Sequence, residues 1–345
     1  MNQNRSSNRI LLISLAIGAA TAATAVIVLA SVPETRQAFQ NRPLAYVGAA
    51  SCILLPSLLM GGGITLVKKA RKPIVRISSL FASICVSLLI HAFLAVNLIA
   101  PSVMMRTPAP HDSIWEAETV HSFHPFSLEE PNQTLRGIER EGSGVTMLMF
   151  GGSGTDYSRF FGKMLKDDAF LELRILMLDY PGIGESEGIS SESSLLRSGL
   201  KLYDYAKEQY PSDPIVLMGY SLGTGVATYV SANREADGLI LVAPYFEATD
   251  FYTEHGSALY HLCKSLSLQQ FPVYEWAESS DSYPLMVCSF TDKVTPIEGA
   301  SRLLQCFENG GELVAHEDCA HGDYWEQEAT YEWILEYLKD RDLID

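Results

Sequence analysis

The sequence predicts an α/β domain, with a mostly parallel sheet and helices on both faces, preceded by a membrane region of about three transmembrane helices. From about residue 120 onward, short apolar runs alternate with amphipathic stretches, which is typical of strands and helices in alternation. Long uncharged runs fill the first hundred residues. The charge divides in the same way: residues 1–100 hold 9 Lys and Arg against 1 Asp or Glu, and residues 101–345 hold 16 against 40. These observations indicate two different environments.

The membrane region is expected at residues 1–100. Its uncharged runs, at 10–32, 44–67 and 77–100, are each longer than the roughly 20 residues that a helix needs to cross a bilayer. Buried core helices are the alternative interpretation. Short basic loops between the runs favour the membrane.

Basic residues predict the orientation of these spans. The loop "KKARKPIVR" at 68–76 holds five of them and is expected in the cytoplasm, which puts the N-terminus there as well. After three spans, the proline-containing linker 101–119 and the domain 120–345 would then lie outside the cytoplasm, in the periplasm or in a lumenal or extracellular space. Residues 1–30 also resemble a cleaved signal peptide, which would leave two spans and the same side for the domain.

The domain 120–345 is expected to contain six strands, formed by short apolar runs, with helices between them. The strands are predicted at 145–150, 174–179, 215–220, 239–244, 285–290 and 312–316, and the helices around 156–168, 190–209, 222–233, 297–308 and 325–340. Polar alternation near 119–127 and 133–140 predicts an antiparallel hairpin that joins the sheet. In such sheets, functional residues gather where the strands end.

The stretch "LMGYSLGT" at 217–224 turns a strand abruptly into an alanine-rich helix. The pattern G-x-S-x-G at such a corner is the nucleophile elbow, in which glycines let the backbone crowd together. We expect the turn to expose Ser221 Oγ at the helix N-terminus.

Other strand ends supply the partners that a serine nucleophile needs. The glycine-rich "GGSG" follows the strand 145–150, Asp292 follows the strand 285–290, and His321 follows the strand 312–316. The chain order Ser, Asp, His is the order found in the catalytic triads of one hydrolase fold.

From about residue 120 to 340 the chain resembles the α/β-hydrolase superfamily, and particularly its membrane-anchored members of the esterase, lipase and thioesterase type. The matching pieces are "FGGSG", "LDYPGIGESEG", "MGYSLGTGVA", "SFTDKVTP" and "AHGDYW". The resemblance implies a serine hydrolase that cleaves a carboxylic ester or thioester through an acyl-enzyme on Ser221. A small-molecule or lipid-like acyl ester is the expected substrate, near the bilayer that holds the N-terminal helices.

Within this resemblance each site residue has a role. Ser221 would be the nucleophile, His321 the base that takes its proton, and Asp292 the carboxylate that orients the imidazole. The backbone N–H groups of Leu222 and Ser153 would form the oxyanion hole. Many members have His-Gly where this chain has Gly151-Gly152. This departure leaves the support of the loop and the acyl-group preference open.

Other residues compete for these roles. Asp281 precedes its strand and so lies at the wrong end, while His316 is expected to end the last strand. Asp179 is expected to cap a turn, and Asp323 either orients the His321 loop or is a solvated turn residue. The remaining histidines of the domain, His255 and His261, fall in an insert and are expected at the surface.

The insert at 244–284 is rich in aromatic residues and could form a small lid. Its aromatic side chains would either line an apolar pocket or serve as ordinary packing residues of the helices. They are Phe246, Phe251, Tyr252, Tyr260, Phe271, Tyr274 and Trp276.

The composition argues against several classes of partner. The acidic second part disfavours nucleic acid and anionic headgroups. No zinc spacing such as C-x-x-C occurs, and the expected chemistry requires neither a metal nor a cofactor. Cys263, Cys288, Cys306 and Cys319 could form disulfides outside the cytoplasm, but their pairing does not follow from the sequence.

Three alternatives to an ester or thioester hydrolase remain open at this stage. An amidase or peptidase can use the same fold and triad. A binding or scaffold protein on a degenerate hydrolase fold is disfavoured by the intact order of the three residues. A membrane transport or assembly factor is disfavoured because the apolar runs contain no paired charges.

Overall fold

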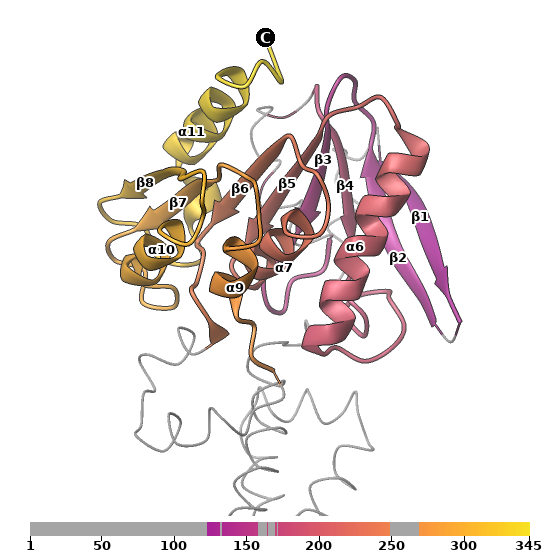
Figure 1. The fold of residues 1–345 in the computed structure, drawn as a ribbon. Coiled ribbons are helices and arrows are strands. Elements are labelled where there is room, and N and C mark those ends of the chain that lie inside the picture. Colours follow the sequence, from indigo (N-terminus) through magenta and orange to yellow (C-terminus); the bar gives the residue numbers. More distant parts are fainter. Residues whose placement is uncertain (1–122, 132, 158–163, 165–169, 171, 249–268) are drawn as a thin grey trace, which may run out of the picture. The chain divides into compact units, whose positions relative to one another are not determined.

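The apolar runs of the second part assemble into one twisted sheet (Figure 1). The computed structural model describes residues 123–131, 133–157, 164, 170, 172–248 and 269–345. Its strands are β1 (Phe123–Glu130), β2 (Gln133–Arg140), β3 (Thr146–Phe150), β4 (Arg174–Leu178), β5 (Ile215–Tyr220), β6 (Gly238–Val242), β7 (Leu285–Ser289) and β8 (Glu312–His316). The six strands and the hairpin that the sequence predicts are therefore confirmed.

The strand order in the sheet is β1-β2-β4-β3-β5-β6-β7-β8. All neighbours from β4 to β8 pair in parallel. The hairpin β1–β2 is antiparallel and joins the sheet by an antiparallel pairing of β2 with β4. The mostly parallel sheet brings the carboxyl ends of β3, β5, β7 and β8 to one edge, where the predicted site residues lie.

Helices cover both faces of the sheet, as predicted (Figure 1). One face packs against α6 (Glu192–Gln209), α7 (Leu222–Ser231), α9 (Val273–Ala277) and α10 (Ile297–Leu304), and the other against the 3-10 helix η4 (Tyr324–Glu326) and α11 (Glu328–Lys339). Side chains alternate between the faces along a strand. In β3, Leu148 and Phe150 accordingly belong to the core under α6 and α7, while Met147 and Met149 belong to the core under α11.

Helix α6 begins at a capping box. The Ser191 hydroxyl accepts a hydrogen bond from the Ser194 N–H, and the Ser194 hydroxyl accepts one from the Ser191 N–H. These bonds satisfy backbone donors that the first helical turn cannot pair internally. The cap fixes where α6 starts, directly after the loop that follows β4.

The predicted insert at 244–284 leaves and rejoins the sheet layer through a paired stem. The Ala248 N–H donates to the Gln270 carbonyl at 3.3 Å, and the Tyr274 N–H donates to the Phe246 carbonyl at 3.3 Å. The segment that enters the insert, at Phe246 and Ala248, is therefore hydrogen-bonded to the segment that leaves it, at Gln270 and Tyr274.

Several predictions fall on residues that the structure does not describe. They are the spans 10–32, 44–67 and 77–100, the linker 101–119, most of the helix expected at 156–168, and residues 249–268 of the insert. Among the described residues, no helix has both the length and the apolar character needed to cross a membrane.

Candidate active site

A sharp turn joins β5 to α7, and Ser221 lies at its corner. Ser221 has φ 52° and ψ −121°, in a region that residues with a side chain rarely occupy. Two backbone bonds of 2.9 Å hold it: its N–H donates to the Val242 carbonyl, and its carbonyl accepts from the Thr224 N–H. Such a conformation costs about 1–3 kcal/mol and persists only where the surroundings fix it.

The glycines of the G-x-S-x-G pattern make this turn possible. A Cβ on Gly219 would lie 2.5 Å from the Gly223 carbonyl oxygen, and a Cβ on Gly223 would lie 2.0 Å from the Phe150 carbonyl oxygen. Both obstacles are backbone atoms, so side-chain rotation cannot relieve them. The pattern thus brings the start of α7 against the end of β3, as a nucleophile elbow requires.

The structure brings Ser221, His321 and Asp292 into one hydrogen-bonded chain. His321 Nε2 lies 2.9 Å from Ser221 Oγ, and His321 Nδ1 lies 2.8 Å from Asp292 Oδ2. The three side chains come from the loops after β5, β8 and β7, so they meet only because these strands end at the same edge. This geometry lets the imidazole take a proton from the hydroxyl while the carboxylate holds the opposite N–H.

Asp292 is held as a buried, ionised carboxylate. Its Oδ1 accepts the N–H groups of Val294 and Thr295 at 2.8 and 3.0 Å, and its Oδ2 accepts the hydroxyls of Thr295 and Tyr324 at 2.9 and 3.1 Å. Burial by itself would raise the pKa of Asp292. The hydrogen bonds, with the one from His321 first among them, outweigh burial and lower that pKa below its ordinary value.

Ser221 is less exposed than the sequence suggested. Only 3% of its surface is accessible, whereas we expected an exposed hydroxyl. The difference arises because the elbow places Oγ against the His321 ring and beneath the loop after β3. The sequence pattern predicts the turn correctly, but it does not show that His321 and the loop after β3 cover the serine at its corner.

The residues predicted for the oxyanion hole flank the serine. Leu222 is the first residue of α7, and Ser153 follows β3 on the glycine-rich loop. A Cβ on Gly152 would lie 3.4 Å from Ser221 Cβ, which shows how closely this loop passes the serine. Backbone N–H groups at these positions are suitable for stabilising an oxyanion, a role that stays a prediction.

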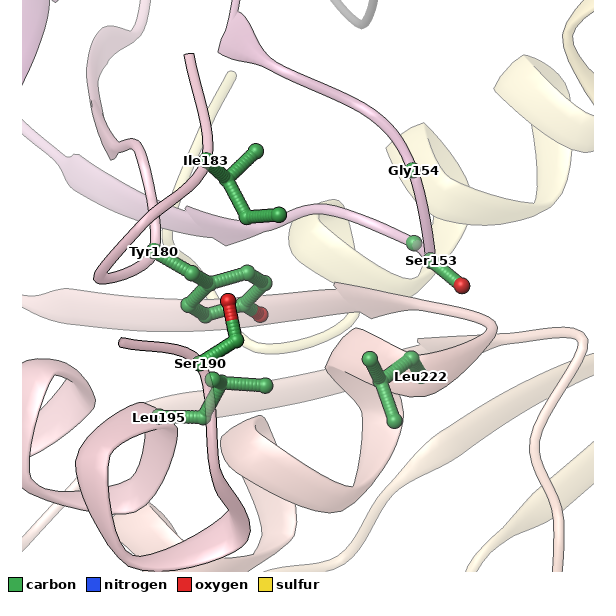
Figure 2. A pocket seen from close by; sticks show the side chains of 8 residues that line it. Ser153, Gly154, Tyr180, Ile183, Ser190, Leu195 and Leu222 are labelled. Atoms are coloured by element: carbon green, nitrogen blue, oxygen red, sulfur yellow. The ribbon is translucent and has the colours of Figure 1, made fainter. Parts of the chain in front are cut away.

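Leu222 and Ser153 also line one small pocket (Figure 2). Figure 2 shows the side chains of Tyr180, Ile183, Leu195 and Leu222 converging on a common space, with Ser153 and Gly154 along one side. The full lining is Gly152, Ser153, Gly154, Tyr180, Ile183, Ser190, Leu195 and Leu222. The pocket therefore combines the predicted oxyanion donors with mostly apolar walls.

Known structures and family models match the fold of this chain. An esterase of Pyrococcus furiosus superposes with a TM-score of 0.54 and 17% identity, over 68% of this chain and 97% of its own. An α/β hydrolase of Vibrio vulnificus superposes with a TM-score of 0.56 and 19% identity, over 71% and 92%. The family model described as serine aminopeptidase, S33, matches residues 146–285, and the one described as TAP-like protein matches residues 252–343. The chain belongs to the α/β-hydrolase superfamily.

Curated relatives within the superfamily resemble part of this chain. Lysophosphatidylserine lipase ABHD12 of Rattus norvegicus is 25% identical over 181 residues, which are 51% of this chain and 39% of the relative. Protein ABHD12B of Homo sapiens is 35% identical over 88 residues, 24% of each chain. The chain thus spans about two fifths of the length of the lipases it matches. The similarity supports the expectation of a hydrolase.

Sequence reasoning missed several residues that support this α/β-hydrolase site. The Tyr220 hydroxyl donates to the His321 carbonyl, and its ring stacks on the His321 ring with centroids 5.7 Å apart. The Tyr180 hydroxyl donates to the Gly151 carbonyl at 3.2 Å and so supports the loop whose Gly-Gly departs from the usual pattern. Tyr324 and Thr295 support Asp292. All four lie inside the motifs that carried the resemblance, which is the signal that could have singled them out.

The competing residues lie elsewhere. His316 ends β8, is buried, and forms a 2.8 Å hydrogen bond with the Thr330 hydroxyl; burial lowers its pKa. Asp281 is exposed and precedes β7, at the opposite edge of the sheet. Asp323 is exposed, and its side chain does not cap η4. His255 and His261 fall among the residues that the structure does not describe.

Asp179 ties together two loops beside the site. Its Oδ1 accepts the Tyr157 N–H at 2.8 Å and its Oδ2 accepts the Glu185 N–H at 3.0 Å. Burial, and then the charges of Asp156 and Glu185, raise its pKa to about 7 against the two backbone hydrogen bonds. Asp179 is a turn-capping carboxyl, as predicted.

The described aromatic residues of the insert serve packing. Phe246 stacks on Tyr274 with centroids 4.7 Å apart, and Trp276 packs edge-on against Tyr229 of α7 at 5.2 Å. Phe271 is fully buried in the same core. Of the two interpretations for the insert, ordinary packing therefore applies to these four. Phe251, Tyr252 and Tyr260 lie outside the described residues.

The described cysteines are free thiols. Cys288 and Cys319 are buried and Cys306 is partly buried; burial, foremost, raises the pKa of Cys319 to about 11. Cys263 falls on an undescribed position. Across the described ranges, no group of three or more His, Cys, Asp or Glu side chains could hold a metal ion.

Proposed function

We propose that the chain is a membrane-anchored serine hydrolase that cleaves a carboxylic ester or thioester through an acyl-enzyme on Ser221. The observation that supports this most strongly is the hydrogen-bonded chain from Ser221 Oγ to His321 at 2.9 Å and from His321 to Asp292 at 2.8 Å. A strained elbow, a lowered Asp292 pKa and adjacent backbone donors add to the support.

In the first half of the proposed reaction, His321 Nε2 accepts the Ser221 proton as Oγ attacks the carbonyl carbon. Asp292 accepts the Nδ1–H bond and stabilises the imidazolium that forms. The N–H groups of Leu222 and Ser153 bind the oxygen that becomes negative. His321 then returns the proton to the leaving alcohol or thiol, and the acyl group stays on Ser221.

In the second half, His321 takes a proton from water, and the resulting hydroxide attacks the acyl carbon. The Ser221–acyl bond breaks, and the proton returns to Ser221 Oγ. The same oxyanion donors serve both halves, since both pass through a tetrahedral intermediate. No cofactor or metal takes part in this scheme.

A lipid-like acyl ester is the substrate class that the relatives favour, because several of them are named lysophosphatidylserine lipases. The pocket beside Leu222 has mostly apolar walls, which favour contact with an acyl group over contact with a charged one. A second candidate is hydrolysis of an amide or peptide bond, which is favoured by the family model described as serine aminopeptidase. Both use the same triad, and a panel of esters, thioesters and amides would separate them.

The membrane part of the proposal rests on the sequence. The uncharged runs 10–32, 44–67 and 77–100 support three transmembrane helices, and the basic loop 68–76 supports a cytoplasmic N-terminus. The hydrolase domain 120–345 would then lie outside the cytoplasm, after the linker 101–119. An alkaline phosphatase fused to the C-terminus should be active in cells; an inactive fusion would refute this topology and leave the triad unaffected.

A fluorophosphonate probe tests the catalytic proposal on the full chain. Wild type should be labelled, Ser221→Ala should lose all labelling, and His321→Ala should lose most of it. Ser279→Ala and His124→Ala are matched controls because both side chains are exposed and remote from the elbow in sequence. Unlabelled, folded wild type would favour a binding or scaffold protein on this fold.

A further inference from the structure

Large apolar side chains are exposed at one edge of the described part of the chain. Four large apolar side chains are exposed among the described residues, three of them at that edge: Ile189 at 71%, Phe290 at 60%, Tyr283 at 40% and Val294 at 36%. Ile189, Phe290 and Val294, called here the apolar rim, all lie on loops at the carboxyl ends of strands. Tyr283 lies before β7, at the opposite edge.

The apolar rim flanks the serine on both sides. Ile189 lies in the loop after β4 and directly precedes Ser190, which lines the pocket. Phe290 and Val294 lie in the loop after β7, on either side of Asp292. In the sheet, β5 is two strands from β4 and two strands from β7. At about 5 Å per strand, each part of the rim is roughly 10 Å to the side of the elbow.

The fold does not require these side chains. A side chain that is mostly accessible contributes little burial energy, and isolated exposed apolar residues are common. Among the described residues, three of the four exposed large apolar side chains lie at the edge that holds the candidate site, and this shared location is what indicates a contact surface.

The charges beside the apolar rim restrict the kind of partner. Glu185 and Glu187 are exposed next to Ile189, and Glu317 and Asp318 are exposed on the loop before His321. Lys293 is a single exposed cation between Phe290 and Val294. These carboxylates repel an anionic surface, whereas the apolar side chains beside them are compatible with a zwitterionic or neutral surface.

We propose that the apolar rim contacts an electrically neutral lipid surface, from which acylated substrate reaches the pocket beside Ser221. Each apolar tip that leaves water for the acyl region strengthens the contact. The contact keeps the mouth of the site at the lipid, so that an acyl chain can pass from one apolar environment to another. The delivery step rests on the proposed function, whereas the contact itself does not.

The contact is tested by fluorescence quenching in the full chain. Phe290→Trp and its control Tyr283→Trp are placed with vesicles of phosphatidylcholine that carries bromine on its acyl chains. We expect the fluorescence added by Phe290→Trp to be lost and that added by Tyr283→Trp to persist, relative to wild type. Replacing part of the lipid by phosphatidylglycerol should reduce the quenching. Equal quenching in both variants, or none in Phe290→Trp, would overturn the proposal.

Delivery of substrate from the lipid to the site is tested with two esters that share the same leaving group, p-nitrophenol. The Ile189→Ser/Phe290→Ser variant should cleave p-nitrophenyl acetate, which stays in water, as wild type does. It should cleave p-nitrophenyl palmitate in phosphatidylcholine vesicles about tenfold more slowly or worse, because two apolar tips no longer enter the lipid. Tyr283→Ser should match wild type on both esters.

The remaining outcomes also decide the question. An equal loss on both esters would place the two side chains in the fold or the pocket and overturn the proposal. A changed oligomeric state with unquenched Phe290→Trp would assign the apolar rim to a second copy of the chain. If wild type cleaves neither ester, the proposed function fails, while the quenching result still decides the contact.

Discussion

Two buried carboxyl groups at the same edge of the sheet have opposite electrostatic environments. Asp179 follows β4 and Asp292 follows β7 after a short turn, and they are 2% and 4% exposed. Each accepts two backbone N–H groups, at 2.8 and 3.0 Å in both cases. By residue type, position and burial they are close to equivalent.

The other groups around each carboxyl give Asp292 and Asp179 different pKa values. Asp292 also accepts hydrogen bonds from His321 and the hydroxyls of Thr295 and Tyr324, and its pKa lies below the ordinary value. Asp179 is buried near the acidic Asp156 and Glu185, and its pKa rises to about 7. Burial alone therefore does not set the charge state of a carboxyl group; the donors and charges that surround it do.

The largest expected effect is that of Asp292→Asn on turnover. An amide at this position cannot hold the imidazole in the tautomer that accepts the serine proton, so kcat should fall by about 10⁴-fold. The measurement is kcat for a p-nitrophenyl ester with the full chain. Asp281→Asn, an exposed carboxylate at the other edge, is the control and should behave as wild type. A loss below tenfold would remove Asp292 from the proposed triad.

Asp179→Asn should affect catalysis far less, because Asp179 holds loops and touches no reacting atom. Displacement of the glycine-rich loop should lower kcat by no more than about 10²-fold. The measurement is the same ester assay. A loss as large as that of Asp292→Asn would mean that the two carboxyls are not functionally distinct.

Stability should change with pH in opposite directions for the two carboxyls. The Asp179 pKa is raised from 3.8 to about 7, so its stabilising contribution is complete below pH about 4 and is lost as the pH rises to about 7. The free energy of unfolding of wild type relative to Asp179→Asn should therefore fall across that window, by at most about 4 kcal/mol. The pKa of Asp292 is lowered, so its contribution to the free energy of unfolding is present at pH values above the ordinary carboxyl pKa. That contribution is lost as the pH falls through the lowered pKa. Denaturant titrations at several pH values measure both; parallel trends would contradict the comparison.

Removing the hydroxyls around the triad should have smaller effects. Tyr220→Phe loses the hydrogen bond to the His321 carbonyl, and Tyr324→Phe loses the one to Asp292. Each should lower kcat by about three- to tenfold, the equivalent of one hydrogen bond, with KM unchanged. Because Phe keeps the ring packing, the unfolding midpoint should stay close to that of wild type. A changed KM with constant kcat would argue against a positioning role.

The smallest effect is expected at Ser186, which supports Asp179 only through the backbone. Its hydroxyl donates to the Asp179 carbonyl at 2.7 Å and accepts the Arg136 N–H at 2.8 Å. Ser186→Ala should cost about 1–2 kcal/mol of unfolding free energy and leave kcat unchanged. Differential scanning and the ester assay measure the two quantities, and a selective loss of kcat would refute this purely structural assignment.

The centre of the sheet could be predicted because strands β3 to β7 are buried on both faces and form continuous apolar runs in the sequence. The ends of the strands were less accurate. The strand predicted at 239–244 is Gly238–Val242, since Ala243 adopts φ 55° and turns the chain. The strand predicted at 174–179 ends at Leu178, where the Asp179 carboxyl begins to cap the next turn. Hydrophobicity alone carries no signal for such turns.

The site residues could be singled out because parallel strands bring their ends together whatever lies between them in sequence. The positions of Ser221, Asp292 and His321 followed from motif and order, and their catalytic roles stay a prediction. Tyr220 and Tyr180 lie inside the same motifs, but their hydrogen bonds could not be predicted, because each hydroxyl donates to a carbonyl of a loop remote in sequence. Such contacts depend on packing, and a tyrosine in the sequence looks the same whether or not it makes them.

The paired stem of the insert has a consequence for how this chain can change over evolution. Because Ala248 is tied to Gln270 and Phe246 to Tyr274, the sheet meets the same two attachment points whatever the length of chain between them. Lengthening a closed loop costs only about 0.6 kcal/mol per doubling. Segments of different length and sequence can therefore be accommodated between Ala248 and Gln270 over evolution, while the elbow and its partners stay unchanged.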